Sequence, residues 1–124
     1  LGICLGMQLL TNSSEEGEEQ GFCWLDAETK KFNHQELKIP HMGWNSINIE
    51  KPSFMFNHPD KERRYYFVHS YYVECRDRKD ILTTTDYGHP FTSMVEKGNI
   101  YGAQFHPEKS HAFGIELLTN FAKL

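Results

Sequence analysis

The stretch Leu1-Gly2-Ile3-Cys4-Leu5-Gly6-Met7-Gln8 decides the fold that we expect for this chain. A cysteine stands between two glycines at the end of a short apolar run, and this spacing is typical of a sharp turn from a strand into a helix. Such a turn crowds its own backbone, so a Cβ at the flanking positions would not fit. It lifts Cys4 out of the sheet and places the thiol near a helix N-terminus, where the thiolate is favoured. The pattern therefore predicts a nucleophilic cysteine.

A histidine that could serve this cysteine stands near the other end of the chain, in Gln104-Phe105-His106-Pro107-Glu108-Lys109-Ser110. A cysteine nucleophile needs a base that takes its proton and a third group that orients the base. His106 and Glu108 supply both, and the intervening proline fixes one backbone dihedral between them. We therefore predict a triad of Cys4, His106 and Glu108. From the first motif alone, a buried and inert cysteine in a packed turn remains the alternative.

The cysteine and histidine motifs together resemble class I (triad-type) glutamine amidotransferases. Three stretches narrow the resemblance to the glutaminase subunits of imidazole glycerol phosphate synthase: Pro40-His41-Met42-Gly43-Trp44-Asn45, Tyr66-Phe67-Val68-His69-Ser70-Tyr71 and Tyr101-Gly102-Ala103-Gln104-Phe105-His106-Pro107-Glu108-Lys109-Ser110. The resemblance runs from the first residue to the last. It implies an α/β domain with the flavodoxin-like three-layer fold of that family, present as its C-terminal portion only.

The resemblance also implies an activity. The chain would hydrolyse the side-chain amide of glutamine to glutamate and ammonia without a cofactor. It would pass the ammonia to a synthase subunit of barrel fold, in a heterodimer that makes imidazole glycerol phosphate in histidine biosynthesis.

Residues of the glutamine site follow from the same resemblance. Gln8 and Glu16 match side chains that contact glutamine, and the carboxylate of Glu16 would receive the α-ammonium group. Ser70 and Tyr71 match positions whose backbone amides hold the α-carboxylate. The backbone amide of Leu5 would hold the oxyanion, together with one amide from a loop upstream of this chain.

Trp44, Tyr66 and Lys109 match family positions at the interface with the synthase. From residue type alone, a tryptophan on a connecting loop is as consistent with a core position as with an interface. We interpret His69 as a structural histidine that completes a hydrogen-bond network, because His106 already fills the role of the base.

Composition restricts the class of protein. The 124 residues suffice for one small domain, which we expect to be truncated at its N-terminus because only three residues precede Cys4. A formal net charge of −4 argues against a nucleic-acid partner. Three widely spaced cysteines argue for a reducing compartment, and the cytoplasm is the default location. No apolar run approaches a membrane span, and the scattered histidines predict no metal site.

Residue patterns predict a helix over 5–12, whose apolar face would comprise Leu5 and Leu9 with Met7 and Leu10. They also predict a last helix after Ser110, which would cap it. The apolar stripe of the last helix would be Phe113, Leu117, Phe121 and Leu124. Residues 40–45 are expected to form a connecting loop and residues 51–64 a polar surface excursion. The expected strands are 22–25, 29–32, 45–50, 65–70, 71–75, 81–87, 91–96 and 100–105.

Other interpretations of the function remain open. Residues 22–25 and 110–114 look closer to a paralogous branch that supplies ammonia for amidino groups on bacterial surface-polysaccharide sugars. A stand-alone cysteine hydrolase of γ-glutamyl bonds would keep the triad without a partner, although the block at 40–45 speaks against it. A non-catalytic remnant would keep the motifs without a reactive thiol.

Overall fold

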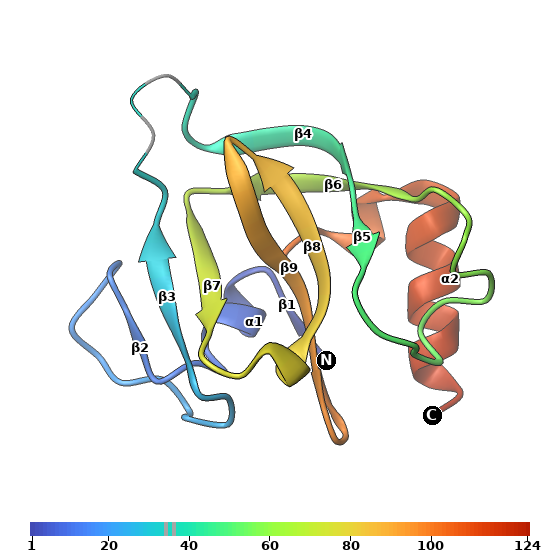
Figure 1. Cartoon of the computed structure of the whole chain (residues 1–124), viewed down its shortest axis with the longest axis horizontal. Coiled ribbons are helices and arrows are strands. Elements are labelled where there is room, and N and C mark those ends of the chain that lie inside the picture. Colours follow the sequence, from blue (N-terminus) through green and yellow to red (C-terminus); the bar gives the residue numbers. More distant parts are fainter. Residues whose placement is uncertain (34, 36) are drawn as a thin grey trace.

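A curled sheet forms the centre of the molecule in the computed structural model, which describes residues 1–33, 35 and 37–124. The strands of this sheet are β1 (Gly2–Ile3), β2 (Ser13–Ser14), β3 (Ala27–Lys31), β5 (Asn48–Ile49), β7 (Tyr71–Cys75), β8 (Ile81–Tyr87), β9 (His89–Lys97) and β10 (Ile100–Ala103). Two further strands, β4 (His41–Ser46) and β6 (Arg64–His69), pair with each other in a small second sheet, which crosses the upper end of the molecule in Figure 1.

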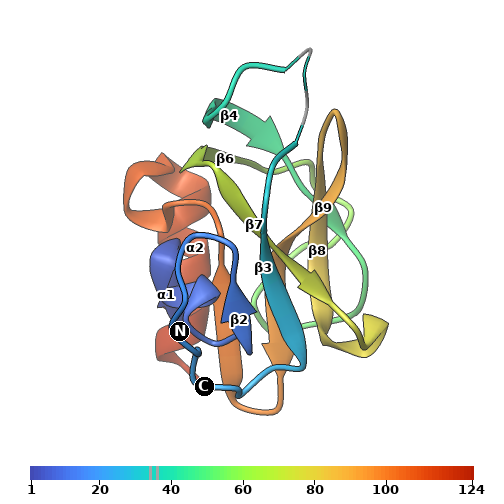
Figure 2. The same cartoon turned by 90° about the vertical axis from the view of Figure 1, so that its left-hand side faces the viewer.

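The helices among the described residues are short except for the last. They are α1 (Leu5–Gln8), α2 (His111–Ala122) and the 3₁₀ turns η1 (Arg78–Asp80) and η2 (Pro107–Lys109). In the view of Figure 2, α1 and α2 lie together on one side and β8 lies on the other. The expected α/β class is therefore what the structure shows.

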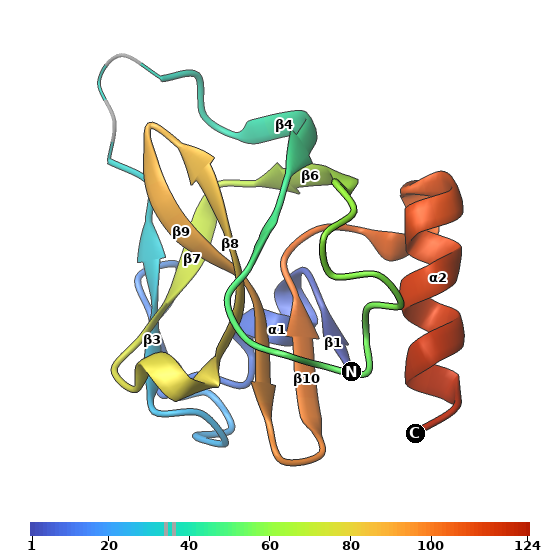
Figure 3. The same ribbon diagram turned by 45° about the vertical axis from the view of Figure 1, so that its right-hand side comes forward.

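Strand order in the large sheet is β1-β10-β9-β7-β3-β2, and β8 pairs with both β9 and β5. The pairs β1 with β10 and β2 with β3 are parallel, and the other pairs are antiparallel. Figure 3 shows β1 beside β10, although the two strands come from opposite ends of the chain. The fold thus joins the two motifs that the sequence keeps far apart.

The strands predicted between residues 65 and 105 are confirmed as β6 to β10. Their density of aromatic and β-branched residues suits a pleated, half-buried surface. Their inward side chains supply most of the main hydrophobic cluster, whose buried members are Phe32, Ile47, Met55, Phe56, Tyr65, Phe67, Leu82, Phe91, Met94, Tyr101, Ala103, Phe105 and Leu117.

The first helix is shorter than predicted, because α1 ends at Gln8 rather than at residue 12. The carbonyls of Leu9, Leu10 and Thr11 accept hydrogen bonds from the amides of residues 22–25 instead of continuing the helix. These bonds also explain why residues 22–25 do not form the predicted strand. The expected apolar face was partly wrong too: Met7 and Leu10 are buried, whereas Leu5 and Leu9 are 57% and 43% exposed.

Residues 40–45 are not the predicted connecting loop, because β4 occupies His41–Ser46 and pairs with β6 along its whole length. A proline just ahead of a strand removes no ladder hydrogen bond, so Pro40 does not prevent β4 from pairing. The strand predicted over 45–50 is interrupted, and only Asn48–Ile49 forms β5.

Ser110 ties the last helix to the sheet but does not cap it as predicted. Its hydroxyl donates to the His106 carbonyl at 2.6 Å and accepts from the Tyr66 amide at 3.0 Å. The helix packs tightly on η2, since a Cβ at Gly114 would lie 1.8 Å from the carbonyl oxygen of Pro107. The remaining members of the predicted stripe differ: Leu117 is buried, Phe113 and Phe121 are partly buried, and Leu124 is 59% exposed beyond the helix end.

Candidate active site

Parallel pairing of β1 with β10 positions both halves of the predicted triad. Ile3 lies opposite Ala103, and the Cys4 amide donates to the Ala103 carbonyl at 2.7 Å. Cys4 directly follows β1, and His106 comes three residues after the end of β10. Because parallel strands end at the same edge of a sheet, both residues lie at that edge.

Cys4 has a backbone conformation that few side chains adopt, with φ at 54°. Such residues cost about 1–3 kcal/mol and concentrate at functional sites. The Cys4 carbonyl accepts from the amides of Met7 at 3.1 Å and Gln8 at 3.3 Å, so the turn leads directly into α1. This is the sharp turn between strand and helix that the sequence predicted.

The two glycines beside the cysteine differ in their role. A Cβ at Gly2 would lie 2.5 Å from the carbonyl oxygen of Gly6, so this close approach requires glycine, as predicted. A Cβ at Gly6 would meet open space in the part of the chain that the structure describes. The steric reason that we gave for Gly6 was therefore wrong.

Strand β6 holds the cysteine and the histidine in common. The Cys4 thiol points to the Val68 carbonyl at 3.9 Å, and the His106 amide donates to the Tyr66 carbonyl at 2.9 Å. These carbonyls are two residues apart on one strand, which corresponds to about 7 Å. Strand β6 thus contacts both the cysteine and the histidine of the predicted triad.

The histidine and the carboxylate are in direct contact. His106 Nδ1 lies 2.6 Å from Glu108 Oε1, and the 3₁₀ turn between them is closed by the Lys109 amide donating to the His106 carbonyl at 3.0 Å. A carboxylate only accepts, so Nδ1 carries the proton and Nε2 is the basic atom of the ring. The arrangement suits a histidine that takes and returns a proton.

The expected stabilisation of the Cys4 thiolate is not what the site provides at rest. Burial raises the pKa of the Cys4 thiol above its usual value, and the carboxylates of Glu108 and Glu16 raise it further. The Leu5 amide and the Gln104 side chain lower this pKa, but burial outweighs them. Because α1 has only four residues, its dipole is small. The resting cysteine is a thiol that needs a base.

Gln8 and Tyr71 meet beside the cysteine. The Gln8 side-chain amide donates to the Tyr71 carbonyl at 3.2 Å and to Gln104 Oε1 at 3.0 Å. Gln104 Nε2 in turn points to the Cys4 sulfur at 3.7 Å. Sequence reasoning did not single out Gln104, although a glutamine directly after a buried strand needs partners for its amide. Its side chain is fully buried next to the nucleophile.

The other residues of the predicted glutamine site surround this group more loosely. Glu16 follows β2, is exposed and acts on the pKa of Cys4 through its charge. Ser70 joins β6 to β7 next to Tyr71, and its carbonyl accepts from the Phe32 amide at 3.1 Å. The Leu5 amide is near enough to lower the pKa of the thiol.

The three residues assigned to an interface lie on one surface next to the histidine. Trp44 is 41% exposed, so it is not a core residue, and its ring stacks on His111 with centroids 5.5 Å apart. Trp44 pairs with Tyr66 across β4 and β6. Lys109 is exposed at the end of η2. We call Trp44, Tyr66 and Lys109 the η2 surface.

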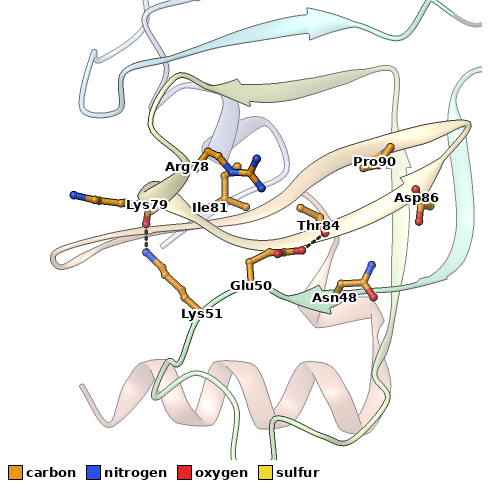
Figure 4. A pocket seen from close by; sticks show the side chains of 9 residues that line it. All are labelled: Asn48, Glu50, Lys51, Arg78, Lys79, Ile81, Thr84, Asp86 and Pro90. Atoms are coloured by element: carbon orange, nitrogen blue, oxygen red, sulfur yellow. Dashed lines mark hydrogen bonds between the residues drawn. The ribbon is translucent and has the colours of Figure 1, made fainter.

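A separate hollow of about 570 Å³ lies away from the triad, between β5, β8 and η1 (Figure 4). Two of its charged residues already have partners, because Thr84 donates to Glu50 at 2.7 Å and Lys51 donates to the Glu96 carbonyl at 2.8 Å. This hollow has no part in the chemistry of Cys4. Among the described residues, no helix is long and apolar enough to cross a membrane.

Curated relatives match almost the whole chain. Imidazole glycerol phosphate synthase subunit HisH 2 of Methanococcus maripaludis is 56% identical over 99% of this chain and 61% of that protein. Imidazole glycerol phosphate synthase subunit HisH of Leptospira borgpetersenii is 48% identical over 100% of this chain and 63% of that protein. The chain thus spans about three-fifths of the length of these relatives.

Solved structures with low sequence identity share the fold. A glutamine amidotransferase from Thermotoga maritima has a TM-score of 0.62 at 18% identity, over 98% of this chain and 45% of that one. The glutaminase domain of a Trypanosoma brucei CTPS with bound acivicin has a TM-score of 0.63 at 19% identity, over 98% of this chain and 59% of that one. The family model named glutamine amidotransferase class-I matches residues 1–124. The chain therefore belongs to the class I glutamine amidotransferase family.

Proposed function

We propose that the chain is the glutaminase part of an imidazole glycerol phosphate synthase. It hydrolyses glutamine to glutamate and ammonia and passes the ammonia to a synthase subunit for histidine biosynthesis. The observation that carries the proposal is the placement of Cys4 and the paired His106 and Glu108 at one edge of the sheet. The names of the curated relatives support the choice of pathway.

The reaction begins with the protonated thiol. His106 Nε2 takes the proton of Cys4 as the sulfur attacks the side-chain carbonyl carbon of glutamine. The Leu5 amide stabilises the oxyanion of the tetrahedral intermediate. His106 then gives the proton to the departing nitrogen, ammonia leaves, and a glutamyl thioester remains on Cys4.

Water completes the cycle. His106 takes a proton from the water that attacks the thioester, and the thiol is regenerated as glutamate leaves. Glu108 holds the imidazole in the required tautomer and stabilises its charged form. Because burial keeps the resting thiol protonated, attack depends on this base.

The substrate is an amino acid with two charged groups next to its α-carbon, and the site offers partners for both. Glu16 supplies a carboxylate for the α-ammonium group, and the backbone amides of Ser70 and Tyr71 receive the α-carboxylate. The Gln8 side chain links this turn to the nucleophile, because its amide donates to the Tyr71 carbonyl and to Gln104, which contacts the Cys4 sulfur.

The partner is a synthase subunit of barrel fold in a cytoplasmic heterodimer, docked on the η2 surface. Support comes from two exposed residues: Trp44, which pairs with Tyr66, and Lys109, whose amide donates to the His106 carbonyl. A subunit docked there is close to the departing ammonia. Aromatic residues of this kind are enriched at interface hot spots.

A second acceptor deserves a test. The relatives from Methanococcus maripaludis and Pseudomonas aeruginosa both carry the number 2 in the name HisH 2. The names themselves assign no other acceptor. The alternative is the paralogous branch that residues 22–25 and 110–114 resemble, with the same glutaminase chemistry but with ammonia used for surface-polysaccharide sugars.

The deciding experiment measures glutamate release by the complete polypeptide encoded by the gene, with and without a synthase subunit of the histidine pathway. Stimulation by that subunit, lost in Cys4→Ala, supports the proposal. Activity that does not respond to the subunit would overturn the histidine assignment and favour the other acceptor. If the complete polypeptide released no glutamate even with the subunit, the glutaminase proposal itself would be wrong.

A further inference from the structure

Two buried histidines face each other across the small sheet of β4 and β6. His41 and His69 are register partners and are only 3% and 6% exposed. His41 Nδ1 lies 2.9 Å from His69 Nε2. The proposed chemistry of the triad uses neither ring, so this contact needs its own explanation.

The partners of the two rings fix where the protons are. His69 Nδ1 lies 2.7 Å from the Tyr71 carbonyl, which can only accept, so this nitrogen carries a proton. His69 Nε2 in its neutral ring then accepts from His41 Nδ1. His41 Nε2 accepts in turn from the side-chain amide of Asn45 at 3.2 Å. Both rings are thus neutral in one defined tautomer, and each ring nitrogen has a partner.

The surroundings favour this neutral state. The His41 ring stacks on Tyr87 and Phe67, with centroids 4.1 and 4.8 Å apart, and Phe91 packs against both histidines. Burial lowers the pKa of His41 to about 4 and that of His69 to about 3. The pair therefore keeps the same hydrogen-bond pattern at neutral pH.

One end of this chain of hydrogen bonds is in the glutamine site. The Tyr71 carbonyl accepts from His69 and also from Gln8, whose amide leads through Gln104 to the sulfur of Cys4. The position of the Tyr71 peptide thus depends on the His69 ring. A shift of that peptide would move the substrate-binding turn and the Gln8 side chain together.

The other end is in β4, the strand that carries Trp44. Asn45 donates from one side-chain nitrogen to His41 and to the Asp86 carbonyl, at 3.2 and 2.9 Å, and its oxygen accepts from the Ser46 amide. These three bonds fix the Asn45 side chain and tie β4 to β8. The outer end of the chain is therefore anchored beside the η2 surface.

We propose that Asn45, His41 and His69 form a relay of positioning residues that couples β4 to the glutamine site. The relay holds the Tyr71 carbonyl in place, so the order of the substrate-binding turn depends on how β4 is held. A subunit that docks over Trp44 restrains β4 and, through the relay, the site that binds glutamine. This inference rests on the proposed glutaminase function and concerns the regulation of that same site.

The central test breaks the relay at His41, whose side chain lies on β4 rather than in the glutamine site. In the complete polypeptide with its synthase partner, His41→Leu removes the donor to His69 and should raise KM for glutamine about tenfold, the usual effect of one buried hydrogen bond. The change in kcat should stay within about twofold because the triad is intact. His41→Asn, whose amide can donate from near the Nδ1 position, should recover most of the affinity.

A second readout separates positioning from chemistry. A glutamine-derived electrophile reaches Cys4 only through the substrate site, whereas iodoacetamide needs only an accessible thiol. His41→Leu should slow labelling by the first reagent about tenfold and leave labelling by the second within about twofold. Asn45→Ala, at the less buried outer end, should give the same pattern more weakly and serves as the relay variant least prone to misfolding.

The matched control is Phe91→Leu, which loosens the packing on both histidines without removing a relay hydrogen bond. It should lower Tm to a similar degree and leave KM unchanged. If Phe91→Leu and His41→Leu raised KM equally, or if His41→Leu had the KM of the parent protein, the relay would be refuted. Failure of the parent protein itself to hydrolyse glutamine would instead overturn the proposed function.

The tautomers provide a test that needs no activity. Two-bond proton–nitrogen NMR spectra of the complete polypeptide at pH 7 should show neutral rings protonated at Nδ1 for both His41 and His69. Protonation at Nε2 in either ring would contradict the relay, because the Tyr71 carbonyl or His69 would then lose its donor.

Discussion

The histidine side chain has two different roles in this molecule. His41 and His69 lie on the paired strands β4 and β6, and His106 lies on the turn whose amide bonds to β6. His106 keeps a fifth of its side-chain surface in solvent and bonds to a carboxylate, which stabilises a charged imidazole. His41 and His69 are buried among aromatic rings and bond to each other, which keeps both neutral. Surroundings, not residue type, decide whether a histidine moves protons or holds a backbone in place.

The largest effect should come from the histidine that is paired with Glu108. His106→Asn removes the base for a thiol that burial keeps protonated, so we expect kcat to fall by at least about 10³-fold. Steady-state glutaminase assays of the complete polypeptide with its partner would measure this loss. If kcat fell by less than tenfold, another group would take the Cys4 proton. His106 would then not differ in role from the two buried histidines.

Glu108→Gln should have the next largest effect. The amide can still contact the imidazole but no longer stabilises its positive charge, so kcat should fall by about 10²-fold with little change in KM. The two parameters can be separated by varying glutamine in the same assay. An unchanged kcat would mean that the charge of Glu108 has no part in the reaction.

The double variant Trp44→Ala with Lys109→Ala should act through the partner. We expect the affinity for the synthase partner to fall about thirtyfold, because a tryptophan hot spot is worth about 2 kcal/mol. Glutaminase rates measured at increasing concentrations of that partner give both the affinity and the plateau. If both were unchanged, the assignment of the η2 surface would be wrong.

The smallest effect should be on stability in mild acid. Because the pKa of His41 and His69 is lowered in the folded state, the unfolded chain binds more protons below its own histidine pKa of about 6.5. The contribution of the neutral pair to the free energy of unfolding is therefore fully present above that pH and declines as the pH falls towards 4. We expect Tm to drop by about 5 °C between pH 6.5 and 5.

A variant isolates the contribution of the buried pair. His69→Gln should flatten the fall of Tm across the same interval, whereas His58→Asn, at an exposed position, should leave it unchanged. The pair of Arg63 with Glu116 does not interfere, because the pKa of Glu116 is lowered from 4.5 and its contribution is lost only at more acidic pH. If Tm fell equally with pH in His69→Gln and in the parent protein, the two histidines would not be a neutral buried pair.

The sequence predicted features that depend on local pattern. The aromatic and β-branched residues between 65 and 105 indicated the strands. The spacing around Cys4 and His106 indicated a turn and a histidine–carboxylate pair, which the structure brings together. Likewise, the interpretation of His69 as part of a hydrogen-bond network is confirmed.

What the sequence could not predict depends on long-range partners. The carbonyls that end α1 bond to residues 22–25, and β4 exists because β6 lies alongside it, in spite of Pro40. Gln104 gains its place in the site from Gln8 and Cys4, which are distant in sequence. The pKa of Cys4 follows burial by the whole fold, which no local motif reveals.

The pairing of β1 with β10 also has a consequence for biosynthesis on the ribosome. The Cys4 amide bonds to Ala103, and its sulfur contacts Gln104, 100 positions further along the chain. Contacts of such high sequence separation form late in folding. While residue 104 is still inside the ribosome, a nascent chain has the cysteine but not the residues that surround it, so the proposed glutaminase site is absent from a half-made protein.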